Sequence, residues 1–212
     1  MQRDLTRGPI ARGLLLFALP LMAGNLLQQL YNVADTWVVG RFLGSDALAA
    51  VGSSYTLMTF LTSIFLGLCM GSGTAFSIQY GRRDMERFKR SLFVSFLLLA
   101  GITLLLTVLV FVLLDWILLL MQTPPELMAL MRQYLWCIFW GIPATFLYNF
   151  FANVLRSVGN SAVPLLFLAI SAIMNIVLDL VFVLVFHWGV AGAAIATVIS
   201  QYFSGIGILL YT

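Results

Sequence analysis

Residues 91–114 read SLFVSFLLLAGITLLLTVLVFVLL, a run of 24 residues without a charged side chain. A helix needs about 20 apolar residues to cross the hydrocarbon core of a bilayer, so this stretch predicts a membrane span. The whole chain has the same character, because 62% of its 212 residues are hydrophobic and 9% are charged. So little charge cannot coat a water-facing surface. A soluble domain is therefore excluded, and the net charge of +3 gives no support for nucleic-acid binding.

Charge clusters, prolines and glycines divide the chain into six predicted transmembrane helices. Pro20 lies in the first third of the first helix and is expected to kink it, because proline removes one backbone hydrogen bond. Residues 82–90 hold the dense charge cluster and are expected to form a solvated loop. The fold class is all-α membrane protein, with spans at about 14–39, 47–80, 91–121, 126–155, 162–187 and 190–211.

The distribution of basic residues predicts the orientation of these spans. Nine of the 11 Lys and Arg residues lie in the N-terminal tail, in 82–90 or at Arg156, and only Arg41 and Arg132 lie on the opposite side. Cytoplasmic loops carry the excess of basic residues, so both termini are expected in the cytoplasm. The sequence stops just after its last span, and an even number of spans lets a second copy follow in the same orientation. We therefore expect half of a longer protein, or a half that self-associates.

Two carboxylates are predicted to lie inside the hydrocarbon region, where ionisable residues are costly and usually functional. One is Asp35, the last of four polar residues that follow one another at intervals of 3, 4 and 3 residues. These intervals place the four side chains on one face of the first helix. Interhelical hydrogen bonding could explain the amides of this series, but it explains a carboxylate poorly where no Lys or Arg lies at the same depth. The series comprises Asn25, Gln28, Asn32 and Asp35, with Tyr31 beside it.

The second carboxylate, Asp179, lies four residues after Asn175, so the two side chains share one helix face. An amide and a carboxylate can hydrogen-bond each other or surround a small cation; the alternative is a protonated Asp that only packs. Tyr134 and Thr197 fall near the same depth as Asp35, and four helices can thus converge there. Tyr134 could instead belong to an interfacial aromatic belt, and Thr197 could bond back to its own helix.

Signatures of enzymes are missing from the sequence. It contains no HExxH, no GxSxG and no glycine-rich phosphate loop. Its two cysteines form no CxxC pair. We therefore expect a protein that is not an enzyme and that needs no cofactor.

Several segments together resemble the multidrug and toxic compound extrusion (MATE) family. They are ALPLMAGNLLQQLYNVADTWVVGRFLGSDALAAVG, GSGTAFSIQYGRRD, VLRSVGNSAVPL, NIVLDLVFV and GVAGAAIATVISQ. The resemblance implies a twelve-helix antiporter of two six-helix lobes, with this chain as the N-terminal lobe in a bacterial inner membrane. It also implies export of organic cations or other amphipathic compounds against inward H⁺ or Na⁺, with the second lobe and the lipid bilayer as partners.

The resemblance further implies roles for individual residues. Cation coupling is expected at Asp35, Asn175, Asp179, Thr197 and Tyr134, and the first four of these could hold Na⁺. The substrate cavity and the bending of the first helix are expected to involve Pro20, Gln28, Tyr31 and Asn32.

Two other functions remain open at this stage. A related flippase for lipid-linked sugars should have a basic cavity, whereas this lobe offers two acids and no Lys or Arg in the hydrocarbon region. A non-transporting membrane assembly protein would not need two unpaired acids there.

Overall fold

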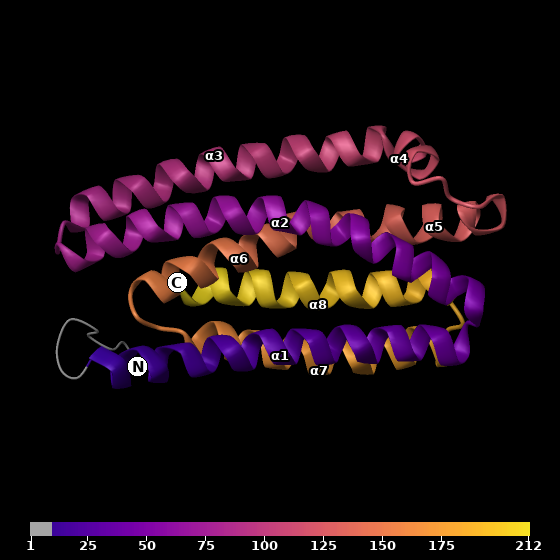
Figure 1. Cartoon of the computed structure of the whole chain (residues 1–212), viewed down its shortest axis with the longest axis horizontal. Helices are drawn as coiled ribbons and strands as arrows, with labels where there is room; N and C mark the ends of the chain where they lie inside the picture. The colour runs from indigo at the N-terminus through magenta and orange to yellow at the C-terminus, as the bar shows by residue number, and fades with distance from the viewer. Residues whose placement is uncertain (1–9) are drawn as a thin grey trace.

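The structure is a computed structural model that describes residues 10–212, and every regular element in that range is helical (Figure 1). The long helices lie side by side along one axis. Both ends of the described chain lie at the left of Figure 1, together with the α2–α3 and α6–α7 turns. In chain order the elements are α1 (Ile10–Phe42), α2 (Ser45–Gly81), α3 (Met85–Val112), α4 (Leu114–Leu120), α5 (Pro125–Ile138), a 3₁₀ turn (Phe139–Gly141), α6 (Ile142–Ser157), α7 (Ala162–Leu180), a π-helical turn (Val181–Val185) and α8 (Gly189–Tyr211).

The lengths and compositions of these helices fit a membrane. Within residues 10–212, five helical segments are long and apolar enough to cross one: α2, α3, α5 joined to α6, α7 with its π turn, and α8. Helix α1 contains 33 residues, about 50 Å of helix, and continues through Pro20 to Phe42. Large apolar side chains such as Leu15, Leu104 and Leu120 project from the bundle surface. The prediction of an all-α membrane protein is confirmed.

The charged segment at 82–90 is not a loop over its whole length, which corrects the sequence-based expectation. Only residues 82–84 lie between helices, and α3 begins at Met85 rather than near 91. The side chain of Asp84 caps α3 by accepting a hydrogen bond from the backbone nitrogen of Arg87 at 3.1 Å. Lys and Arg are good helix formers, and their long side chains reach water from the first turns of a helix.

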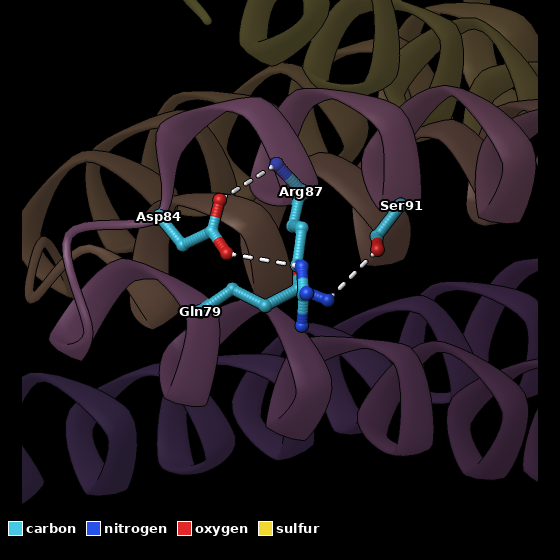
Figure 2. A network of polar contacts seen from close by, with 4 residues as sticks. All are labelled: Gln79, Asp84, Arg87 and Ser91. Atoms are coloured by element: carbon cyan, nitrogen blue, oxygen red, sulfur yellow. Dashed lines mark hydrogen bonds and ion pairs between the residues drawn. The ribbon is translucent and has the colours of Figure 1, made fainter.

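Side chains also tie the end of α2 to the start of α3, as Figure 2 shows. The amide Nε2 of Gln79 donates to Oγ of Ser91 at 2.8 Å. One turn away, Nε of Arg87 pairs with Oδ2 of Asp84 at 3.2 Å. The bond from Gln79 to Ser91 joins α2 to α3, and the Arg87–Asp84 pair stabilises the first turn of α3.

Three of the expected continuous helices are interrupted. The expected helix at 91–121 breaks at Leu113, after which the short α4 begins. The helix expected at 126–155 tightens into a 3₁₀ turn before Pro143, where proline leaves a backbone carbonyl without its donor. The helix expected at 162–187 widens into a π turn, in which the backbone nitrogen of Phe186 bonds to the carbonyl of Val181 at 3.0 Å. This last irregularity begins two residues after Asp179.

Small residues let α8 approach α6 closely. A Cβ atom on Gly205 would lie 2.7 Å from the carbonyl oxygen of Ala144, and one on Gly141 would collide with the side chain of Gln201. Small residues commonly allow such close contacts between helices in membranes. Polar residues of both helices line the same cavity.

Candidate functional site

Two buried carboxylates from neighbouring helices form the centre of the site. Asp35 lies on α1 and Asp179 on α7, and these two helices pack against each other. Asp35 is 9% exposed and Asp179 is fully buried. Their carboxyl groups are close enough to interact with each other. The structure thus brings together the two acids that the sequence singled out separately.

No donor satisfies these carboxylates in the described part of the chain. One oxygen of Asp35 and both oxygens of Asp179 are buried without a hydrogen-bond partner, as is Oδ1 of Asn175. The two ion pairs that the structure shows among described residues, Arg87–Asp84 and Arg132–Asp115, involve neither acid. Two unpaired negative charges in a buried site are costly. An arrangement of this kind favours binding of a proton or a small cation.

Asn175 and Thr197 extend the acid pair toward α8. Nδ2 of Asn175 donates to Oγ1 of Thr197 at 3.2 Å, and the two residues are 1% and 6% exposed. The hydroxyls of Thr103 and Thr107 bond back to their own helix, whereas Thr197 accepts from a different helix. Asp35, Asn175, Asp179 and Thr197 together offer carboxylate, amide and hydroxyl oxygens. These are the ligand types that hard cations prefer, so the residues fit the sodium site expected from the sequence.

Tyr134 lies inside the bundle rather than in an interfacial belt. It is 7% exposed, while its neighbour Trp136 is 54% exposed. Its ring on α5 lies within electrostatic range of Asp35, Tyr31 and Asp179. The structure therefore places Tyr134 in the neighbourhood of the acid pair, as expected.

A cavity of about 150 Å³ lies beside the acid pair. Pro20, Gln28 and Tyr31 of α1 line it, and Asn175 and Thr197 connect it to the acids. Asn32 does not line this cavity: its amide donates to Oε1 of Gln29 at 3.3 Å instead. The polar face of α1 is therefore divided between the cavity and the helix surface.

The sequence reasoning missed most of the cavity wall. The missed polar residues are Thr62 of α2, Thr145, Tyr148, Asn149 and Arg156 of α6, Ser161 and Ser171 at the start and middle of α7, and Ser200, Gln201 and Ser204 of α8. A signal was available on two helices, because Tyr148 and Asn149 follow Thr145 by three and four residues, and Ser204 follows Ser200 and Gln201 by four and three, the spacing of one helix face.

Arg156 corrects a second expectation. The sequence placed Arg156 in a polar linker and did not connect it with the binding site. In the structure Arg156 belongs to the last turn of α6, is half-buried and lines the cavity. The cavity therefore has a basic group at its far end from the acid pair.

Comparisons with known proteins agree with this architecture. The profile of the MatE family matches residues 20–181. The chain is 36% identical to the probable multidrug resistance protein YpnP of Bacillus subtilis, over 93% of this chain and 44% of that protein. It is 30% identical to the multidrug export protein MepA of Staphylococcus aureus strain NCTC 8325, over 97% of this chain and 46% of that protein.

A solved structure has the same fold. A crystal structure of a MATE protein in the bent conformation superposes with a TM-score of 0.91 and 28% sequence identity, over 98% of this chain and 46% of that one. The chain thus spans about half the length of the relatives it matches.

Proposed function

Because the chain belongs to the MATE family, we propose that it serves as one half of a cation-coupled antiporter that exports organic cations and other amphipathic drugs. The acid pair is the observation that carries this proposal. Two carboxylates from α1 and α7 meet in a buried site without a basic partner. Such a site can bind a proton or Na⁺ in one step and a cationic substrate in another. The names of the related proteins YpnP and MepA refer to drug resistance and drug export.

The coupling ion, H⁺ or Na⁺, binds among Asp35, Asn175, Asp179 and Thr197, with Tyr134 nearby. Binding neutralises the acids. The polar face of α1 is then no longer held in one position by their charge. The face that carries Gln28 and Tyr31 then repacks, helped by the missing hydrogen bond at Pro20, and the drug leaves. The driving force is adequate, about 2.3 kcal/mol per charge per 100 mV and about 1.4 kcal/mol per pH unit for protons.

The same proposal includes an orientation and a partner. The α2–α3 and α6–α7 turns lie at the end of the bundle where both ends of the described chain lie (Figure 1), and they carry the cluster at 82–90 and Arg156. Arg3 and Arg7 lie outside the described residues. The lobe lies in a bacterial inner membrane, and by the positive-inside rule this end faces the cytoplasm. A second six-helix lobe, in the same polypeptide or in a second copy, completes the transporter.

A flippase for lipid-linked sugars is the second candidate, and Arg156 is the observation that favours it. A diphosphate needs several positive charges, however, and Arg156 is the only charged residue among the described residues that line the cavity. The buried acids would repel such a substrate. They also argue against a purely structural assembly protein, which has no use for unpaired intramembrane carboxylates.

Substitution of the acids tests the proposal. Asp35→Asn and Asp179→Asn preserve shape but cannot carry the exchanged charge, so each should abolish ion-driven efflux of a cationic dye from loaded vesicles while leaving expression intact. Asp115→Asn is the matched control, because Asp115 is exposed and pairs with Arg132 at 3.1 Å on the bundle surface. Wild-type efflux in both site variants would rule out coupling through these acids.

A further inference from the structure

We infer that the end of the cavity at the α6–α7 turn is an anion subsite, in which Arg156 binds the carboxylate or phosphate group of an amphipathic ligand. The inference rests on the proposed function in so far as it takes an exported amphipath as the ligand. It adds a second pole to the binding site, opposite in charge to the acid pair. Substrates that carry an acidic group would therefore be accepted as well as simple cations.

One nitrogen of the Arg156 guanidinium lacks a partner among the described residues. Its Nε atom is buried without a hydrogen-bond partner, and no acid in the described part of the chain forms an ion pair with it. An arginine kept only for its position at the membrane surface would extend its head group into water. Arg156 instead lies half-buried against the cavity. A ligand with an acceptor group would satisfy the unpaired Nε–H.

The neighbours of Arg156 hold this end of the cavity in a fixed shape. Oγ of Ser161 donates to the carbonyl oxygen of Phe17 at 3.3 Å and so ties the start of α7 to α1. The hydroxyl of Tyr148 donates to the carbonyl oxygen of Pro164 at 3.0 Å. Both residues line the cavity while using these hydroxyl protons on the backbone. The charged donor left for a ligand is therefore the guanidinium of Arg156.

Further along, the cavity has both polar and apolar walls. The side-chain oxygens of Thr145 and Gln201 are buried without partners, so they can contact polar groups of a ligand. Leucine side chains cover the remaining wall and suit an apolar body. They are Leu21 of α1, Leu66 of α2, and Leu165 and Leu168 of α7. Together these groups fit an amphipath whose anionic end points to Arg156.

The acid pair is too distant to neutralise Arg156. Asp179 lies 18 residues after Ser161 on the same helical segment, which is about 27 Å at 1.5 Å per residue. Arg156 therefore acts as an independent positive pole. Guanidinium binds a carboxylate or a phosphate through two parallel hydrogen bonds, and such charge-assisted bonds are about twice as strong as neutral ones.

Two dyes with the same ring system test the subsite directly. Rhodamine B carries a free carboxylate, and its ethyl ester carries the same cationic rings without that negative charge. Binding of each dye to the protein as its host makes it, in neutral detergent micelles, can be measured by fluorescence anisotropy. We expect Arg156→Gln to weaken rhodamine B binding about tenfold, the order of one charged hydrogen bond, and to change ester binding less than twofold.

Two variants serve as controls. Arg132→Gln removes a positive charge from an exposed arginine that pairs with Asp115 at the other end of the bundle, and it should change neither dye. Arg156→Lys keeps the charge but loses the two-pronged geometry, so it should retain part of the preference for rhodamine B. Arg156→Lys is the milder substitution. If Arg156→Gln folds poorly, the affinities of Arg156→Lys for the two dyes still test the subsite.

The outcomes separate the possibilities. The subsite is overturned if neither dye binds the native protein, if both dyes bind it equally, or if Arg156→Gln and Arg156→Lys weaken both dyes by the same factor. Displacement of rhodamine B by phosphatidylglycerol but not by phosphatidylcholine, lost in Arg156→Gln, would assign the subsite to a lipid phosphate. Absence of that displacement assigns it to an exported acidic amphipath. Failure of ion-driven efflux of the ester, with dye binding intact, would instead refute the proposed antiporter.

Discussion

Replacement of Thr197 by valine separates an ion site from a purely structural hydrogen bond. Valine has the shape of threonine but no hydroxyl, so Nδ2 of Asn175 would lose its acceptor at 3.2 Å. Asn175 is 1% exposed, so bulk solvent does not replace that acceptor, and the water nearest to its amide would be water in the adjoining cavity. An unsatisfied buried donor costs about 1–3 kcal/mol in proteins, and measured interhelical side-chain bonds in membranes average about 0.6 kcal/mol. We therefore expect a loss of about 1 kcal/mol in the free energy of unfolding.

Loss of a ligand oxygen should also weaken ion binding. Removing one of the four proposed donors, at a cost of about 1 kcal/mol, corresponds to about fivefold weaker affinity for the coupling ion. The measurements are thermal unfolding in detergent at increasing Na⁺ and at several pH values, followed by dye efflux under an imposed ion gradient. The ion that stabilises the native protein should stabilise Thr197→Val only at higher concentration.

Thr197→Ser is the matched variant, because it keeps the hydroxyl and removes a methyl group. It should retain the ion dependence of the native protein even if its stability falls. If Thr197→Val and Thr197→Ser show the same ion dependence, the hydroxyl does not contribute to ion binding, and the bond from Asn175 serves packing alone. Stability of Thr197→Val equal to that of the native protein would contradict the magnitude derived from burial.

Two further results are expected. Gly205→Ala should lower the free energy of unfolding by about 1–3 kcal/mol, because its Cβ would meet the Ala144 carbonyl oxygen at 2.7 Å; thermal unfolding tests this against Gly67→Ala, whose Cβ would meet nothing within 4 Å. Ethidium binding, titrated by fluorescence at several pH values and Na⁺ concentrations, should weaken as protons or the coupling cation fill the acid pair, and by linkage ethidium should weaken ion binding by the same factor. Ethidium affinity that ignores both ions would contradict the shared site.

The sequence predicted those parts of the molecule that depend on local composition. The apolar run at 91–114 requires a membrane solvent whatever the tertiary structure, because no soluble fold can bury so much apolar surface in so short a chain. Asp35 and Asp179 stood out because a carboxylate is rare in such runs. Their shared depth followed from helix rise and from the direction of each span, so their convergence needed no knowledge of helix packing.

Local irregularities were not predictable in the same way. The break at Leu113 carries neither proline nor glycine, and the widening at Val181–Val185 lies in a run of apolar residues that an ordinary helix would accept. Such departures depend on how neighbouring helices fill the available space. Aromatic packing contributes at the second of them, where the rings of Phe182 and Trp188 pack in a tilted arrangement with centroids 4.9 Å apart. Hydropathy contains no information of that kind.

Arg156 shows a different limit of sequence-based prediction. The sequence identifies a basic residue at this position, but it does not predict that the side chain is half-buried beside a cavity. A linear profile places an arginine beside Ser157 and Gly159 in solvent, as it does the basic residues at 82–90, and for those the side chains are indeed exposed. What covers Arg156 comes from far along the chain: Pro20 and Leu21 of α1 line the same cavity, and the carbonyl of Phe17 accepts the hydroxyl of Ser161 across 144 residues of sequence. The polar stripes on α6 and α8 at spacings of three and four do point toward that space. They become informative once α1 is known to lie against α7, because a polar stripe in a membrane must face a cavity, a partner helix or water.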